Sequence, residues 1–97
     1  MRIDLHPRFH SDVFAVMEYY EQVAGPDLAD EFYGELRRVM LKAAESPESY
    51  SIRERDLRRA NLRRFPYHFL FRIDADSVRI LVLRHHRRRP YHGLRRR

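Results

Sequence analysis

Hydrophobic side chains follow two different periods along the chain. Residues 1–6 alternate between apolar and polar positions, with Ile3 and Leu5 on one side, which predicts a short strand. Beyond Pro7 the apolar positions recur at helical spacing, in the set Phe9, Val13, Val16, Met17 and Tyr20. Proline suits the first turn of such a helix, and Gly25 suits the position just after its last turn. The pattern therefore predicts a strand followed by an amphipathic helix that ends near Gly25.

A second helical pattern begins directly after Gly25. Its apolar positions are Leu28, Ala29, Phe32, Leu36, Val39, Met40 and Ala43. Acidic side chains lie in its first turn, where the helix macrodipole favours negative charge. Pro47 ends the helix, because the residue before a proline avoids helical backbone angles. Two helices joined by so tight a turn predict a helical hairpin.

The remainder of the chain favours extended structure. Residues 47–56 are polar and predict an irregular connection. Three strands are then predicted over residues 59–63, 68–73 and 78–84, with a hairpin turn at 74–77. The last of them is apolar almost throughout, as expected for a strand that is covered on both faces.

The element order β-α-α-β-β-β predicts an α+β fold. The helical hairpin would pack on one face of a small, mostly antiparallel sheet, and the opposite face would carry arginine side chains from the last strands. Residues 1–97 fit one domain. A basic C-terminal tail occupies about residues 86–97, and we expect Arg95–Arg97 to be a mobile terminus.

Charge is distributed unevenly between the two halves. Residues 1–56 contain 7 basic and 12 acidic side chains, whereas residues 57–97 contain 13 and 2. All basic residues except Lys42 are arginine, which binds phosphate and carboxylate groups in a bidentate manner. The C-terminal half therefore predicts a basic surface for an acidic partner, either nucleic acid or an acidic protein segment.

Several classes of site are excluded or disfavoured. The chain has no cysteine, which excludes disulfides, thiolate zinc sites and a cysteine nucleophile. His6 and His10 are four residues apart, but no third ligand lies nearby, and we expect neither a metal nor a cofactor. No apolar run is long enough for a membrane span and the N-terminus lacks the pattern of a signal peptide, so we expect a cytoplasmic protein.

Four stretches of the chain resemble motifs of the RelE/ParE superfamily, the toxins of bacterial type II toxin–antitoxin systems. They are Leu5–Phe9 with Glu18–Glu21, Ala29–Phe32 with Ala44–Glu48, Arg63–Tyr67 with Phe71–Ile73, and Ile80–His85 with Arg87–Pro90. The resemblance implies a small cytoplasmic toxin that is neutralised by an antitoxin encoded beside it. Members similar to RelE cleave mRNA on the ribosome without a metal, and members similar to ParE poison DNA gyrase.

The closing residues His85–Pro90 look more like the ParE branch, and lysines typical of the RelE-like active surface are missing. We therefore favour a growth-arresting toxin that acts on DNA gyrase and replication. A ribosome-dependent mRNA endonuclease is the alternative, so enzymatic activity stays open. A second alternative is an inactive member, or one that binds nucleic acid non-specifically.

Metal-free RNA cleavage needs a base, an acid and cations. The candidate catalytic residues, in the nuclease case only, are Arg63, Arg64, Arg84, His85, His86 and Tyr91. Neighbouring strand residues point to opposite faces, so one histidine of the pair and one arginine of the first pair would face the groove.

Two further sets concern binding partners. The target-binding set is Arg84, Arg87, Arg88, Arg89 and Tyr91. The antitoxin-binding set is Arg59, Arg63, Arg72 and Arg84. A competing interpretation is that His85 and His86 only end a strand. In the same interpretation, acidic residues of the helices or of the antitoxin pair with Arg63, Arg64, Arg72 and Arg84.

Overall fold

The computed structural model describes residues 1–88 and 92–97. Its elements are β1 (Arg2–Leu5), α1 (Pro7–Ala24), α2 (Pro26–Glu45), the short 3₁₀ helix η1 (Pro47–Ser49), β2 (Ile52–Glu54), β3 (Leu57–Asn61), β4 (Tyr67–Asp74) and β5 (Ser77–His85). The predicted α+β fold is confirmed. Within residues 47–56 the prediction of an irregular connection is wrong, because η1 and β2 form there. The three-residue strand β2 carries no alternating apolar pattern that could reveal it.

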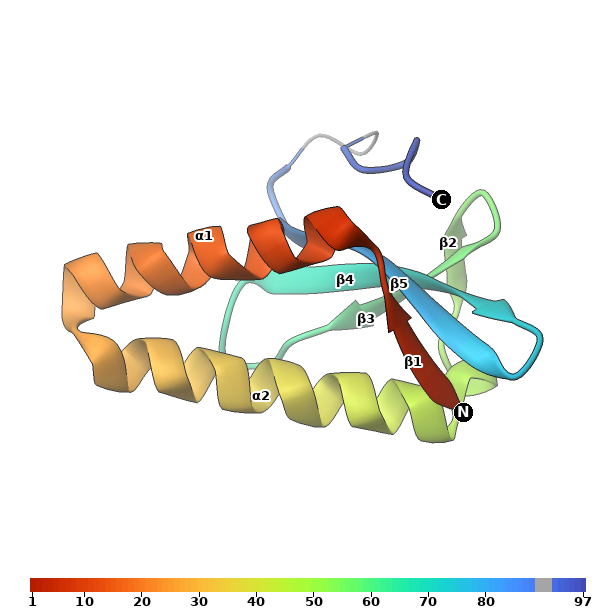
Figure 1. Ribbon diagram of the computed structural model, residues 1–97, viewed down its shortest axis with the longest axis horizontal. Coiled ribbons are helices and arrows are strands. Elements are labelled where there is room, and N and C mark those ends of the chain that lie inside the picture. The colour runs from red at the N-terminus through yellow and green to blue at the C-terminus, as the bar shows by residue number, and fades with distance from the viewer. Residues whose placement is uncertain (89–91) are drawn as a thin grey trace.

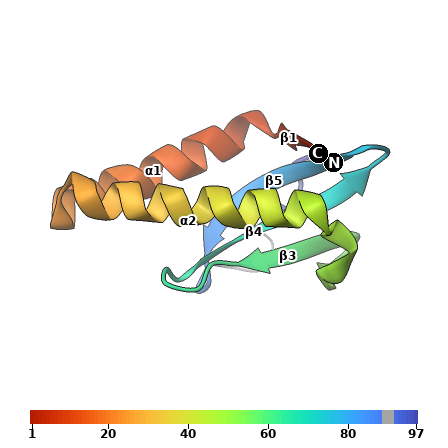
Figure 2. The same cartoon turned by 90° about the horizontal axis from the view of Figure 1, so that it is seen from below.

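The five strands form one sheet in the order β1-β5-β4-β3-β2 (Figure 1). The first strand is parallel to β5, and the other neighbours are antiparallel. Both helices lie on the same side of this sheet, and their connecting turn projects beyond it (Figure 2). The N-terminal strand thus lies beside the last strand, which is far away in the sequence.

The main core lies between the helical hairpin and the sheet. Phe9 and Phe32 of the helices pack on Phe69, Phe71 and other side chains of the strands, and all four rings are at most 1% exposed. Burying an aromatic side chain of this size stabilises a fold by about 2–3 kcal/mol. The apolar faces of the two helices therefore pack on the alternate apolar residues of β4, as the helical period and the strand period of two predict.

A second apolar cluster lies on the opposite face of the sheet. Leu57, Leu70, Leu81 and Val82 are buried there, and Leu94 packs against them. Leu94 belongs to the C-terminal segment, which we define as residues 92–97. This segment explains why β5 is apolar on both faces: helices cover one side and the C-terminal segment covers the other.

Arg96 and Arg97, which the sequence predicts to belong to a mobile terminus, make contacts with the rest of the fold. Arg96 NH1 donates to Asp12 Oδ2 of α1 at 2.6 Å and to the Leu81 carbonyl at 3.1 Å. The backbone oxygen of Arg97 accepts hydrogen bonds from Arg72 and Arg79, at 2.9 and 3.3 Å. The terminus is held by contacts with groups that are distant in the sequence, which composition alone does not reveal.

Gly93 allows the C-terminal segment to approach β5. It has φ +82°, and a Cβ atom at this position would lie 2.6–2.9 Å from three side-chain atoms of Val82. We expect Gly93→Ala to lower the free energy of unfolding by about 2–3 kcal/mol, because steric overlap adds to backbone strain. Urea denaturation of the variant measures this loss.

Gly25 provides the matched control for that substitution. Its φ is +89°, but a Cβ atom there would have no described atom within 4 Å. Gly25→Ala therefore imposes backbone strain alone, at about 1 kcal/mol. Equal losses for the two variants would contradict the close packing of Gly93 on Val82.

Candidate functional site

The sheet face opposite the helices carries arginines from three strands. Arg59 of β3 lies opposite Leu70 in the strand register, and Arg72 of β4 lies opposite Arg79 of β5. Arg84 of β5 pairs with His68 of β4 on the same face. This is the arrangement that the alternation of the last strands predicts, and it brings Arg59, Arg72 and Arg84 of the predicted antitoxin-binding set to one face.

Arg84 is the centre of a buried polar network. Only 4% of this residue is exposed. Its Nε donates to His68 Nε2 at 2.8 Å, NH1 donates to the His92 carbonyl at 3.1 Å, and NH2 forms an ion pair with Glu54 of β2. A buried charge is tolerated only when it is paired and hydrogen-bonded, and these partners meet that requirement. The network joins β2, β4, β5 and the C-terminal segment.

His68 and His86 continue this network toward the surface. Their Nδ1 atoms are 2.9 Å apart, and the ring planes differ by 12° with centres 5.2 Å apart, so the rings meet edge to edge. Because His68 Nε2 accepts from Arg84, a neutral His68 carries its proton on Nδ1 and donates it to His86 Nδ1. Arg59 NH2 lies 3.4 Å from the same His86 nitrogen.

Burial and neighbouring cations favour the neutral form of both imidazoles. Burial, followed by the cations Arg59 and Arg84, lowers the pKa of His68 from 6.5 to about 3. Burial and Arg59 also lower the pKa of His86. In this tautomer His86 Nδ1 is occupied as an acceptor, which leaves its Nε2–H as a hydrogen-bond donor.

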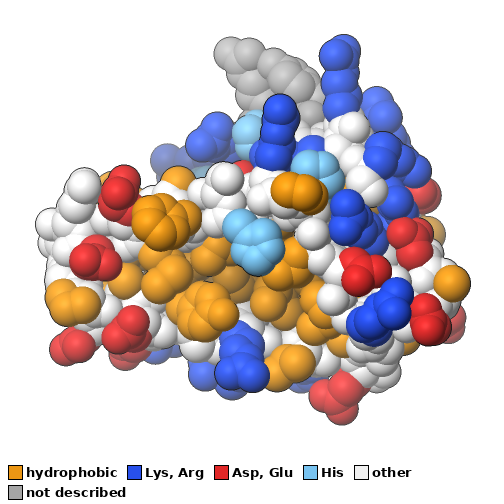
Figure 3. Space-filling view, viewed as in Figure 1, with side chains coloured by type: hydrophobic (Ala, Val, Ile, Leu, Met, Phe, Trp, Pro, Cys, Tyr) orange, Lys and Arg blue, Asp and Glu red, His pale blue; other side chains and the backbone are white. Residues whose placement is uncertain are grey.

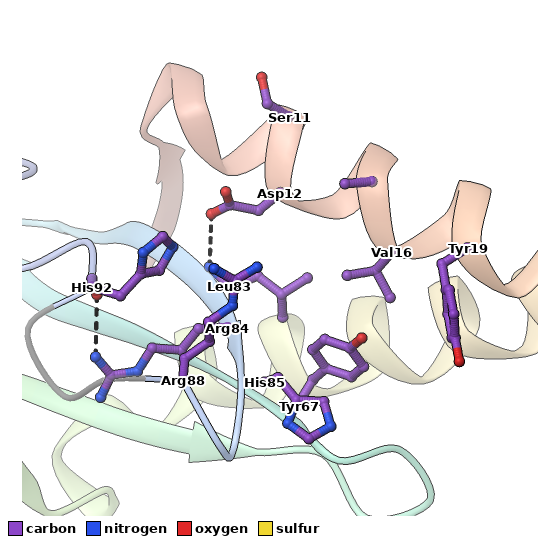
Figure 4. Close-up of a pocket in the computed structure, with 11 residues that line it drawn as sticks. Ser11, Asp12, Val16, Tyr19, Tyr67, Leu83, Arg84, His85, Arg88 and His92 are labelled. Carbon is purple, nitrogen blue, oxygen red and sulfur yellow. Dashed lines mark hydrogen bonds between the residues drawn. The ribbon is translucent and has the colours of Figure 1, made fainter.

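A pocket of about 250 Å³ lies between α1 and β5 (Figure 4). We call it the α1–β5 pocket. Its lining comprises Ser11, Asp12, Ala15, Val16, Tyr19, Tyr67, Leu83, Arg84, His85, Arg88 and His92. Asp12 Oδ2 accepts the Leu83 N–H at 3.0 Å, and the His85 ring meets the edge of Tyr67 with centres 5.1 Å apart. The pocket thus has an apolar wall formed by α1 and Tyr67 and a cationic rim at the end of β5.

The comparisons with known proteins agree with this architecture. A family model described as "ParE toxin of type II toxin-antitoxin system, parDE" matches residues 3–90. The chain belongs to the ParE toxin family. A solved structure titled "Chromosomal ParDE TA system from P. aeruginosa" superposes with a TM-score of 0.78 at 18% identity, covering 88% of this chain and 95% of that one. At that identity the likeness shows the fold alone. A search of curated proteins gave no match.

Within the described part of this ParE-family chain, no helix has the length and apolar character needed to cross a bilayer.

The structure separates the predicted catalytic residues. Arg63 and Arg64 are not on β3, where the sequence pattern places Arg63, because their backbone N–H groups donate to Glu35 of α2, at 2.5 and 3.3 Å. They therefore lie on the side of the helical hairpin, away from Arg84. Arg64 also pairs with Glu31 at 3.6 Å.

His85 and His86 point to different environments, as the alternation predicts. His85 lies in the α1–β5 pocket beside Tyr67, whereas His86 is exposed and lies beside His68 at the surface end of the polar network. Arg87 and Arg88 follow them and are exposed. Two other predicted residues, Arg89 and Tyr91, lie outside the described residues.

Asp12, Glu54 and His68 are among the site residues that the sequence-based sets lack. Asp12 lies off the apolar stripe of α1 and carries no signal of its contact with β5. The same is true of Glu54, which is 30 residues from Arg84. His68 is different: it alternates with Phe69 and therefore shares a face with Leu70, so the period of two could have placed it beside the strand arginines.

Proposed function

We propose that this chain is the growth-arresting toxin of a type II toxin–antitoxin pair, and that it acts in the cytoplasm by binding and poisoning DNA gyrase. Membership of the ParE family supports the toxin role. We favour binding over catalysis because the C-terminal segment covers the arginine-bearing face of the sheet. RNA cleavage needs a base, an acid and cations that reach the substrate, whereas Arg84 and His68 are only 4% and 1% exposed.

The exposed cations at the end of β5 are our candidates for target contact. Arg87 and Arg88 are exposed, and with Arg89 and Tyr91 they form the predicted target-binding set apart from Arg84. Because Arg84 is buried, we assign it the role of holding the end of β5 in place. The proposed contact surface is therefore the turn that follows β5.

A cognate antitoxin that neutralises the toxin is the second part of the proposal. Exposed apolar side chains gather along the helical hairpin, whereas Lys and Arg gather near β2 and the C-terminal segment (Figure 3). The exposed fractions include 72% for Phe14, 60% for Val23 and 55% for Tyr19. Since the C-terminal segment already covers the arginine face of the sheet, we favour the helical hairpin as the main antitoxin surface.

Induction of the chain alone in bacteria, with simultaneous thymidine and leucine pulse-labelling, tests the target. We expect thymidine incorporation to fall first and purified protein to inhibit gyrase supercoiling. An early fall in leucine incorporation, with gyrase unaffected, would instead favour the mRNA endonuclease. Unimpaired growth with soluble, folded protein would favour the inactive alternative. Co-expression of the adjacent reading frame is expected to restore growth.

Paired substitutions test the contact surface. We expect Arg87→Ala with Arg88→Ala to weaken gyrase inhibition about tenfold or more, because exposed arginines are frequent binding hot spots. The matched control is Arg37→Ala with Arg38→Ala, which removes the same charge from the exposed face of α2. Equal effects of the two pairs would indicate a response to net charge alone.

A further inference from the structure

The α1–β5 pocket lies along a part of the β5 edge that has no neighbouring strand within the described structure. The register of β1 on β5 runs only from Arg2 opposite Ser77 to Leu5 opposite Ile80, and the His6 N–H then donates to the Ile80 carbonyl. Beyond that point β5 continues to His85, and no strand among the described residues lies beside it on this side. An exposed strand edge presents backbone donors and acceptors in a row and is a template for strand addition.

The first positions of this edge are occupied by side chains. A register shift opposite Leu70 and Phe71 leaves Leu81 as an extra residue in β5, and its carbonyl accepts from Arg96. The Leu83 N–H donates to Asp12, whose carboxylate is itself paired with Arg96. The Asp12–Arg96 pair therefore takes the place of a neighbouring strand at the start of the open edge.

The next backbone groups along this edge face the pocket. Because the Leu83 N–H points to Asp12 and away from β4, the Leu83 carbonyl and the His85 N–H point the same way. Among residues 1–88 and 92–97 no hydrogen bond is found from this side to either group. In a parallel pair of strands, one residue donates its N–H to the carbonyl of residue i of its neighbour and accepts a hydrogen bond from the N–H of residue i+2. The Leu83 carbonyl and the His85 N–H have this spacing, so they can bond one residue of an added parallel strand.

The surrounding side chains indicate which strand would fit. Val16, Tyr19 and Tyr67 supply an apolar wall, and Arg88 and His92 supply a polar, basic rim. The Asp12 carboxylate in the lining is already paired with Arg96 and Leu83. This combination suits an apolar side chain followed by an acidic one in an extended polypeptide.

We infer that the α1–β5 pocket binds an extended acidic segment of a protein partner, which adds to the free edge of β5. One residue of the segment donates to the Leu83 carbonyl and accepts from the His85 N–H. An apolar side chain lies against Val16 and Tyr67, and a carboxylate lies at Arg88. Strand addition of this kind gains affinity from backbone bonds and specificity from side-chain pockets. The inference does not depend on gyrase being the target.

Nucleic acid fits the same pocket less well. Phosphate oxygens accept hydrogen bonds, so they could use the His85 N–H but not the Leu83 carbonyl. A peptide uses both backbone groups and therefore suits this site better.

The test uses synthetic peptides of alternating glutamate and valine, titrated into isotopically labelled full-length chain and followed by amide NMR. We expect shifts at Leu83, His85, Val16 and Tyr19, and none with a lysine–valine peptide. His85→Pro removes the edge N–H, which does not donate to β4, and is expected to weaken binding about five- to tenfold. The reference variant His85→Ala removes the same ring, which lines the pocket, but keeps that N–H, so the five- to tenfold loss is measured between these two variants.

A second variant keeps the test decisive if His85→Pro fails to fold. Arg88 is exposed, so Arg88→Glu preserves the fold and is expected to weaken the acidic peptide about tenfold, whereas Arg38→Glu on α2 leaves it unchanged. The inference is overturned if the acidic peptides do not bind, if the lysine peptide binds as well, or if shifts lie away from the pocket. Equal affinities of His85→Pro and His85→Ala would also overturn it.

Discussion

Lowering the pH from 6.5 towards 3 is expected to destabilise the fold steeply through His68. The pKa of this buried histidine is lowered from 6.5 to about 3, with burial as the main cause and Arg59 and Arg84 as further ones. Between these values the unfolded chain binds a proton that the folded chain does not. Stability is therefore fully present above pH 6.5 and is lost as the pH falls, by about 1.4 kcal/mol per unit and about 5 kcal/mol in all.

Substitution separates this contribution from that of other acid-sensitive groups. His68→Gln offers Arg84 a neutral acceptor that does not titrate, so the variant is expected to lose most of the slope of unfolding free energy between pH 6.5 and 4. The control is His10→Gln on the exposed face of α1. Urea denaturation across this pH range measures both. A slope in His68→Gln equal to that of the parent chain would contradict a neutral, buried His68.

Removing Glu54 is expected to be the most damaging single change in the polar network. Its partner Arg84 has a side chain that is 3% exposed, so Glu54→Ala leaves a buried cation without its carboxylate. Breaking a buried ion pair from one side typically costs about 3–5 kcal/mol. We place this variant at the lower end, because the Glu54 side chain is itself 20% exposed. The loss is measured by urea denaturation at neutral pH.

Two comparisons sharpen that experiment. Asp56→Ala removes a carboxylate from an ion pair with Arg97 whose side chains are 58% and 60% exposed, and is expected to cost less than about 1 kcal/mol. The double variant Glu54→Leu with Arg84→Met removes both charges and is expected to recover much of the stability lost in Glu54→Ala. A double variant less stable than Glu54→Ala would show that the hydrogen bonds of Arg84 to His68 and His92 matter more than the charge pair.

The candidate site was only partly accessible from the sequence. Alternation along the last strands is enough to place Arg59, Arg72 and Arg84 on one face and to separate His85 from His86. Alternation misplaces Arg63 on the strand, because the backbone N–H groups of Arg63 and Arg64 donate to the Glu35 carboxylate of α2 beyond the end of β3. It also carries no information about Glu54 or Asp12, whose partners lie 30 and 71 residues away.

The sequence by itself determined the two helices, four of the strands, the α+β class and the ParE-like motifs, because hydrophobic period and turn residues act over a few neighbouring positions. Only the tertiary structure decided what covers each surface. It docked the C-terminal segment on the sheet through Gly93 and Leu94, and it buried Arg84 among partners from β2, β4 and the C-terminal segment. It also left β5 longer than β1, which opens the edge beside α1. These features depend on pairings between distant segments, which no local pattern encodes.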